Sequence, residues 1–112
     1  MPYTRQYADP EPALAEVQAR AGDTLLEFGT AWCGHCIAAQ PLIESALAHH
    51  PEVRHLKVED GRGRPLGRAF GVRLWPTLVL LRDGEELARV VRPAGADALQ
   101  RLLAMRGGDP QF

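Results

Sequence analysis

The chain contains two cysteines, and only Gly34 and His35 separate them. The pair follows a short apolar run over residues 24–30 and precedes a segment with helical spacing of apolar residues. Cysteines that build a disulfide scaffold are spread along a chain, because a bridge stabilises mainly by closing a long loop. A bridge between Cys33 and Cys36 would close almost none. We therefore expect this pair to serve chemistry rather than architecture.

Length and composition are those of an ordinary globular domain. The 112 residues predict one domain over 1–112, with an N-terminal arm at 1–8 and a C-terminal tail at 107–112. Hydrophobic residues make up 46% and charged residues 24% of the chain, which excludes a disordered or collagen-like protein. The net charge is −1 and there is no basic block, so we expect neither a nucleic-acid nor an anionic-membrane partner.

The sequence shows no targeting or membrane-spanning segment. No run approaches the roughly 18 apolar residues that a membrane span requires. The first twenty residues carry charges throughout and lack the apolar core of a secretory signal. We therefore expect a cytoplasmic protein.

Apolar spacing and turn residues predict alternating helices and strands. Asp9-Pro10 is expected to start the first helix, as an N-cap followed by a first-turn proline. The arm at 1–8 is a candidate for an extra edge strand. The order predicts an α/β fold, with a central mixed sheet of four to five strands and helices on both faces. The expected elements are a helix after Asp9, a strand over 24–30, a helix after Cys33 with Ile37, Ile43 and Leu47 on one face and a kink at Pro41, a strand over 53–59, a short helix over 66–70, a hairpin of 77–81 and 86–91 around Asp83-Gly84, and a helix over 95–106.

A cysteine pair at the start of a helix has a direct electrostatic consequence. Cys33 is expected at the helix N-terminus, where unpaired N–H groups and the positive end of the macrodipole favour the thiolate. Cys36 lies one turn further along, close enough to bond to the first sulfur. Gly34 allows the tight approach at this turn, and Trp32 provides a flat apolar surface beside the sulfur.

Residues 27–36, E-F-G-T-A-W-C-G-H-C, resemble the active-site segment of the thioredoxin superfamily. The C-G-H-C form is most similar to the catalytic domains of protein disulfide isomerases. Three later features agree with this resemblance: Pro41 stands where the family kinks its active-site helix, Trp75-Pro76-Thr77 matches the cis-proline segment, and residues 81–84 match the penultimate strand and its hairpin turn. The resemblance covers residues 9–106 and implies a thioredoxin-like three-layer sandwich.

The resemblance also implies roles for individual residues. Cys33 would be the attacking thiolate, Cys36 the resolving thiol, and Glu27 the buried acid that relays the proton of Cys36. Independently of the family, a carboxyl group in an apolar strand is costly in its charged form, which suits proton transfer. His35 replaces the proline of the thioredoxin C-G-P-C motif. We expect it to favour the thiolate by donating a hydrogen bond and, when protonated, a positive charge.

The expected substrate rim departs from the family. Pro76, in cis, would hold the neighbouring backbone for pairing with a substrate strand, but Trp75 replaces the usual small aliphatic residue before it. Arg92 and Pro93 stand in the loop where thioredoxins often carry glycine. With Trp32, these residues predict a bulky and basic rim.

The implied activity is thiol–disulfide exchange with protein substrates by a monomer. It would need no bound cofactor or metal, and its electrons would come from a thioredoxin-reductase-like protein or from a thiol pool. The alternative is a non-catalytic thioredoxin-fold module that senses redox state or docks a partner.

The same residues allow other interpretations. The spacing C-x2-C-x12-H-x5-H, which ends at His49 and His55, matches a zinc-finger expression, but a proline interrupts the helix that should carry both histidines. Glu27 could instead face solvent at a strand edge, and Trp75 could belong to the core. His55 and Lys57 are both candidates to cover Glu27 from the next strand, and the sequence does not choose between them.

Overall fold

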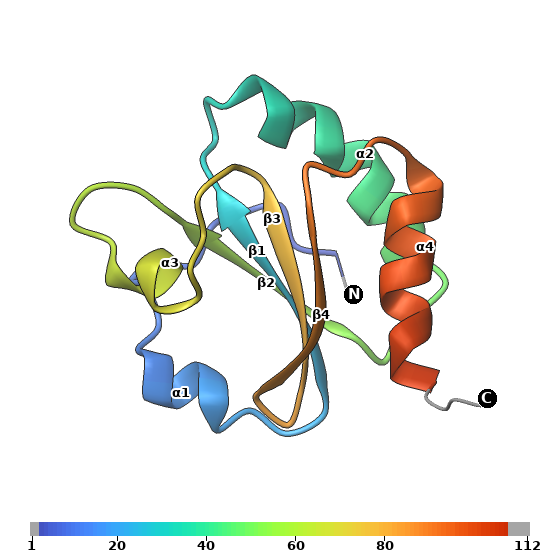
Figure 1. The fold of residues 1–112 in the computed structure, drawn as a ribbon, viewed down its shortest axis with the longest axis horizontal. Coiled ribbons are helices and arrows are strands. Elements are labelled where there is room, and N and C mark those ends of the chain that lie inside the picture. Colours follow the sequence, from blue (N-terminus) through green and yellow to red (C-terminus); the bar gives the residue numbers. More distant parts are fainter. Residues whose placement is uncertain (1–2, 108–112) are drawn as a thin grey trace.

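A four-stranded sheet lies at the centre of the molecule and carries helices on both faces (Figure 1). The structure is a computed structural model, and it describes residues 3–107. Its elements in chain order are α1 (Leu14–Gln18), β1 (Asp23–Gly29), α2 (Gly34–Leu47), β2 (Arg54–Glu59), α3 (Pro65–Ala69), β3 (Thr77–Arg82), β4 (Glu85–Val91), α4 (Ala96–Ala104) and the 3-10 turn η1 (Met105–Gly107). No helix within the described residues is long and apolar enough to span a membrane.

The strands are ordered β2-β1-β3-β4. β1 runs parallel to β2 and antiparallel to β3, and β3 and β4 form the predicted hairpin. Asp83 and Gly84 at its tip have positive φ angles of 51° and 84°. This backbone conformation suits the twist of a two-residue hairpin turn and explains the Asp-Gly pair. The predicted mixed sheet is confirmed, with four strands.

Two apolar clusters hold the three layers together. One lies between the sheet and the helices α2 and α4, and the other lies under α1 and α3 on the opposite face (Figure 1). The alternation of side chains along β1 supplies both clusters, because successive residues point to opposite faces. Leu25 belongs to the first cluster, whereas Leu26 and Phe28 belong to the second. Glu27 therefore faces α2.

The first helix begins later than predicted. Asp9-Pro10 is not its N-cap; α1 begins at Leu14, with Ala13 in the N-cap position. The Ala13 N–H donates to the Glu16 carboxylate at 2.8 Å, which satisfies one of the free donors of the first turn. A proline disfavours the helical conformation of the residue before it, so the helix forms only beyond Pro12.

The predicted face of α2 is wrong at one position. Ile43 and Leu47 are fully buried, but the side chain of Ile37 is 57% exposed. Six residues span about one and two-thirds helical turns, so Ile37 and Ile43 cannot share a face. Cys36 and Ala39 occupy the buried face in place of Ile37.

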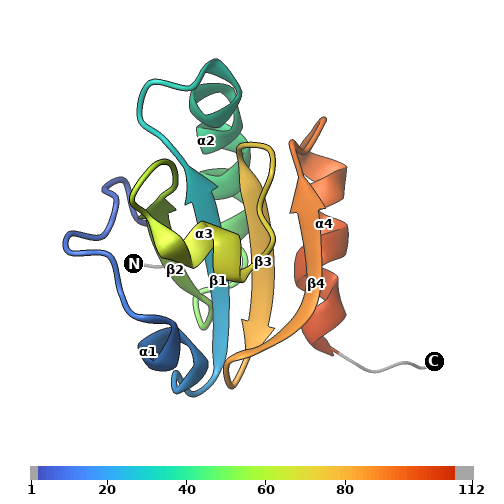
Figure 2. The same cartoon turned by 60° about the vertical axis from the view of Figure 1, so that its left-hand side comes forward.

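The N-terminal arm adds no strand within residues 3–8. It nevertheless follows the free edge of β2 (Figure 2), where the Ala8 N–H donates to the Lys57 carbonyl oxygen at 2.8 Å. Residues 1–2 of the arm and 108–112 of the predicted tail lie outside the described residues.

Candidate active site

The two cysteines lie where β1 ends and α2 begins. Cys33 is the N-cap residue of α2, with extended backbone angles (φ −78°, ψ 124°), and Cys36 lies in the first turn. The free N–H groups of that turn are therefore close to the Cys33 sulfur. Cys33 is 9% exposed and Cys36 is 1% exposed, and both thiols are free. Of the two sulfurs, that of Cys33 is the easier to reach from outside.

The two thiols have opposite electrostatic environments. Burial alone would raise the pKa of Cys33, but hydrogen bonds from the Cys36 backbone N–H and thiol and from the His35 backbone N–H outweigh it, with help from the Arg92 charge. The pKa of Cys33 is therefore lowered. Burial raises the pKa of Cys36, and the neighbouring Cys33 and the charge of Glu27 act in the same direction against the Thr30 backbone N–H.

The end of β1 passes directly beneath Cys36. A Cβ atom added to Gly29 would lie 2.5 Å from the Cys36 sulfur and 3.5 Å from the Tyr7 hydroxyl oxygen. Real Cβ contacts are not that short, so a glycine is required here for the strand to approach the sulfur.

Glu27 is fully buried, which excludes the interpretation that it faces solvent. It is also not the unpaired carboxyl that an apolar strand suggests. His55 Nε2 lies 2.8 Å from its Oε1 atom, and Gln40 Nε2 donates to its Oε2 atom at 2.8 Å. Gln40 Nε2 also donates to the Cys36 carbonyl oxygen at 2.9 Å, and so links the acid to the cysteine helix.

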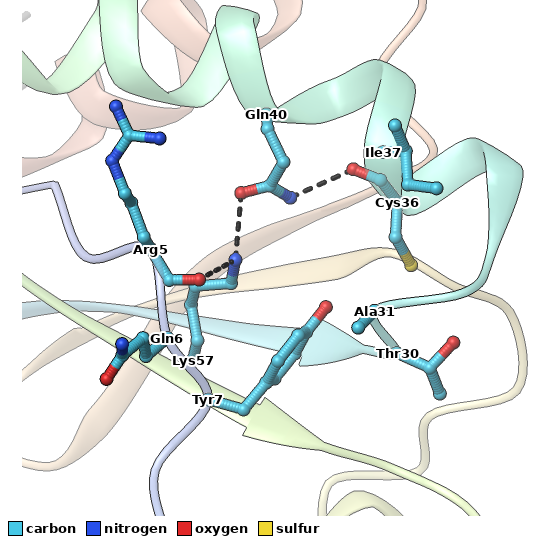
Figure 3. Close-up of a pocket in the computed structure, with 9 residues that line it drawn as sticks. All are labelled: Arg5, Gln6, Tyr7, Thr30, Ala31, Cys36, Ile37, Gln40 and Lys57. Carbon is cyan, nitrogen blue, oxygen red and sulfur yellow. Dashed lines mark hydrogen bonds between the residues drawn. The ribbon is translucent and has the colours of Figure 1, made fainter.

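A cavity of about 410 Å³ opens behind Cys36 (Figure 3). Its polar wall includes Arg5, Tyr7, Gln40 and Lys57, and the Cys36 side chain and Tyr7 hydroxyl enter it from the helix and from the arm. Lys57 Nζ donates to the Arg5 carbonyl oxygen at 2.9 Å and to Gln40 Oε1 at 3.0 Å. Burial raises the pKa of Tyr7, and Glu27 and both cysteines raise it further.

Sequence reasoning did not identify Gln40 or the arm tyrosines as neighbours of the pair. For Gln40 a signal existed, since it lies four residues after Cys36 and therefore one helical turn further on the same side. For Tyr3 and Tyr7 there was none, because nothing in the arm sequence indicates where it docks.

Tryptophan side chains form one side of the rim. The Trp32 side chain is 73% exposed and meets Trp75 edge-on, with ring centroids 5.7 Å apart. Trp75 is half-buried and its indole N–H donates to Asp60 Oδ2 at 2.8 Å, so Trp75 belongs to the rim rather than to the core. The Asp60 carboxylate occupies the space where a Cβ of Gly67 would lie.

The remaining predicted residues complete the rim. The Trp75–Pro76 peptide bond is cis. Arg92 faces this segment, with its Nε donating to the Trp75 carbonyl oxygen and its backbone N–H to the Pro76 carbonyl oxygen, at 2.8 and 2.9 Å. His35 is exposed and lines a groove with Arg92. Among the described residues, no hydrogen bond joins the His35 ring to Cys33, and its backbone N–H is the group that reaches the sulfur.

The described residues hold no group of three or more histidine, cysteine or acidic side chains arranged for a metal ion. His55, which the zinc-finger spacing includes, lies in β2 and has both ring nitrogens engaged, by Glu27 and by the Thr4 backbone N–H at 2.8 Å.

Residues 10–105 match the sequence model of the family described as Thioredoxin. This chain belongs to the thioredoxin family. Thioredoxin 2 from Pseudomonas aeruginosa PAO1, solved in its reduced form, is 56% identical with a TM-score of 0.81, over 90% of this chain and 94% of that chain. Thioredoxin of Chlamydia muridarum is 38% identical over 85 residues, which are 75% of this chain and 82% of that protein. Protein disulfide-isomerase A3 of Gallus gallus is 36% identical over 102 residues, which are 90% of this chain but 20% of that protein.

These likenesses confirm the family and fold that the sequence predicted. Thioredoxin-family membership and the C-x-x-C pair together indicate thiol–disulfide oxidoreductase activity. They also agree with the location of the cysteines at the start of α2 and with the cis Trp75–Pro76 bond.

Proposed function

We propose that this thioredoxin-family protein exchanges disulfides with protein substrates, with Cys33 as the nucleophile and Cys36 as the resolving thiol. The observation that carries the proposal is the contrast between the two sulfurs. A nucleophile must be a thiolate and must be reachable, and the more exposed Cys33 with its lowered pKa meets both conditions. A resolving thiol must stay protonated until the mixed disulfide forms, which suits the buried Cys36 with its raised pKa.

The exchange then proceeds in two balanced steps. The Cys33 thiolate attacks one sulfur of a substrate disulfide, forms a mixed disulfide and releases the other substrate sulfur as a thiolate. Cys36, on losing its proton, attacks the Cys33 sulfur, forms the Cys33–Cys36 disulfide and releases the second substrate thiolate. The substrate gains two electrons and the protein dithiol loses them, so no bound cofactor is required.

Glu27 is proposed to accept the proton of Cys36 in the second step. Its charge contributes to the raised pKa of Cys36, so the two groups interact electrostatically. When Cys33 becomes part of the mixed disulfide, its negative charge disappears and Cys36 loses a proton more easily. Gln40 holds Glu27 and the first turn of α2 together during this change.

Substrate contact is proposed for the rim. Trp32 and Trp75 offer aromatic surface, Arg92 offers positive charge, and the cis Trp75–Pro76 segment lies between these side chains as the proposed place for a substrate strand. His35 and Gly34, at the start of α2, are proposed to tune the Cys33 thiolate. The tight approach predicted for Gly34 is wrong, because a Cβ atom added there would have no neighbour within 4 Å. We further propose a cytoplasmic monomer of one domain that is reduced by a thioredoxin-reductase-like protein or by a thiol pool.

Trapping of mixed disulfides tests whether Cys33 is the nucleophile and Cys36 the resolving thiol. Cys36→Ser should accumulate mixed disulfides with a model protein substrate such as oxidised insulin, because attack survives and resolution does not. Cys33→Ser is the matched control and should accumulate none. Faster alkylation of Cys36 than of Cys33 at neutral pH would reverse the assigned roles.

Insulin reduction with dithiothreitol separates an enzyme from a docking module. Turnover that disappears in Cys33→Ser supports the enzyme, whereas no turnover would favour a redox-sensing or partner-docking module. Direction follows from the reduction potential. A value of about −270 mV is typical of thioredoxin and about −180 mV of protein disulfide isomerase.

A further inference from the structure

His55 contacts Glu27 through a ring whose tautomer the N-terminal arm determines. Its Nδ1 atom accepts a hydrogen bond from the Thr4 backbone N–H at 2.8 Å, and its Nε2 atom lies 2.8 Å from Glu27 Oε1. A backbone N–H can only donate, so Nδ1 carries the lone pair and the proton of the ring lies on Nε2. His55 therefore donates to the Glu27 carboxylate, and its side chain is fully buried.

Gln40 donates to the other carboxylate oxygen, and the arm and β2 together determine the orientation of its amide group. Gln40 Oε1 accepts from the Tyr3 hydroxyl at 2.8 Å and from Lys57 Nζ at 3.0 Å. The amide oxygen is thus assigned by two donors, and the amide nitrogen must point to Glu27 Oε2 and the Cys36 carbonyl oxygen. Both oxygens of Glu27 face N–H donors, and a carboxylate, whose oxygens only accept, is the form that suits both hydrogen bonds.

The arm is attached to this network at several points. The Tyr3 ring stacks on the His55 ring, with centroids 5.3 Å apart and planes inclined by 26°. The Thr4 hydroxyl donates to the His55 carbonyl oxygen at 3.1 Å, and the Arg5 carbonyl oxygen accepts from Lys57 at 2.9 Å. These bonds join the arm to β2 and α2 without any strand pairing in residues 3–8 (Figure 2).

We propose that the N-terminal arm is a working part of the redox site: it holds His55 and Gln40 as donors to Glu27 and so keeps Glu27 as the carboxylate that receives the Cys36 proton. The inference rests on the proposed function of Glu27 and assigns His55 and Gln40 as positioning residues.

The charged and titratable groups around Glu27 come from three elements. β2 contributes His55 and Lys57, α2 contributes Cys36, and the arm contributes Tyr3 and Tyr7, whose pKa values Glu27 raises in addition to burial. β3, on the other side of β1, places the fully buried Leu78 opposite Glu27. The groups that can change the pH dependence of the site therefore lie on the arm, β2 and α2.

Thr4→Pro tests the proposal, because proline removes the N–H that His55 accepts. Thr4→Ala is the matched control, since it keeps that N–H and loses only the hydroxyl. The assay forms a thionitrobenzoate adduct on Cys33 and follows release of the coloured thiol, which reports resolution by Cys36, from pH 5 to 9. Nitrogen-15 NMR of the imidazole reports the His55 tautomer.

In Thr4→Pro the rise of the resolution rate with pH should move upward by about one pH unit, which is about tenfold in rate on the acidic side. The His55 tautomer signal should change with it. Thr4→Ala should stay within about twofold of the parent, because it loses the part-buried hydrogen bond to the His55 carbonyl oxygen but keeps the N–H that His55 Nδ1 accepts. A Thr4→Pro protein with the parent pH profile and tautomer would overturn the proposal. If Thr4→Pro does not fold, Tyr3→Phe takes its place, because it removes only the hydroxyl that donates to Gln40. Its pH profile of resolution should also move upward, by less than one pH unit. A Tyr3→Phe protein with the parent pH profile would then overturn the proposal.

Glu27→Gln separates this proposal from the one on which it rests. If Glu27→Gln resolves the adduct at the parent rate, the proton-accepting role of Glu27 fails. If Glu27→Gln is slow but Thr4→Pro is unchanged, only the role of the arm fails. Adding Thr4→Pro to Glu27→Gln should give no further shift, because the arm is proposed to act through the carboxyl group.

Discussion

The backbone N–H of His35 reaches the Cys33 sulfur, and His35→Pro removes it. Proline is tolerated in the first turn of a helix, so α2 should still begin at Gly34. His35→Ala is the matched control, because it removes the imidazole and keeps the N–H. Comparison of the two variants shows how much of the change in the Cys33 pKa comes from the backbone N–H and how much from the imidazole ring.

The expected change in the pKa of Cys33 follows from the hydrogen bonds that its sulfur loses and keeps. A hydrogen bond to a charged group contributes about 1.5–3 kcal/mol. The Cys36 N–H and the Arg92 charge remain in the variant, so we take the low end of that range. A loss of about 1.4 kcal/mol is about one pKa unit and about 30 mV for a two-electron couple. Because the thiolate is stabilised less, His35→Pro should raise the pKa of Cys33 and make the potential more negative.

Two measurements check this expectation. The pH dependence of iodoacetamide alkylation gives the pKa of Cys33, and equilibration with glutathione gives the potential. We expect His35→Ala to show less than half of the shift of His35→Pro. Equal shifts in the two variants would refute the backbone argument and return the effect to the imidazole. A potential that becomes less negative in His35→Pro would refute the account altogether.

Two further predictions concern stability and the fit beneath the resolving thiol. The Arg82 guanidinium beside Asp23 holds the pKa of Asp23 below its ordinary value, so the ionised Asp23 stabilises the folded state. This stabilisation is complete above the ordinary pKa of about 3.9, and it is lost as the pH falls through the lower pKa of the folded state. Asp23→Asn should therefore reduce the free energy of unfolding by about 1 kcal/mol at pH 7, since Arg82 is partly exposed, and denaturant titrations in strong acid should show no difference. Gly29→Ala places a methyl group 2.5 Å from the Cys36 sulfur and should cost about 1–3 kcal/mol and slow resolution. Gly34→Ala, where a Cβ has no neighbour within 4 Å, is the control, and equal losses in both variants would contradict the packing argument.

The parts of the site that could be predicted lie close together in the sequence. Cys33, Gly34, His35 and Cys36 occupy one helical turn, so their spacing alone places the two sulfurs side by side at the helix N-terminus. The hairpin tip is equally local, because Asp83-Gly84 has the backbone freedom that the turn requires. The family resemblance added the cis bond before Pro76, which no local pattern indicates.

Two predictions failed, one about where the first helix begins and one about which face of α2 is buried. Asp9-Pro10 satisfies the rule for a helix start, but a second proline two residues later keeps the chain extended. Ile37 is apolar and helical, yet its angular position carries it away from the core. The first error came from overlooking the second proline, and the second came from a spacing of six residues, which does not bring Ile37 and Ile43 to one face of a helix.

The sequence by itself determined the dithiol, its place at the start of a helix and a carboxyl in the strand before it, because these depend on bonds and spacings along a few residues. The tertiary structure alone decided what surrounds that carboxyl. β1 and β2 pair with Glu27 opposite Lys57 and Leu25 opposite His55, so alternation turns both basic side chains to the face that carries Glu27. The arm then docks on the same edge through contacts that span 51 residues between Thr4 and His55. Strand register and docking depend on the packing of the whole chain, and no short segment contains that information.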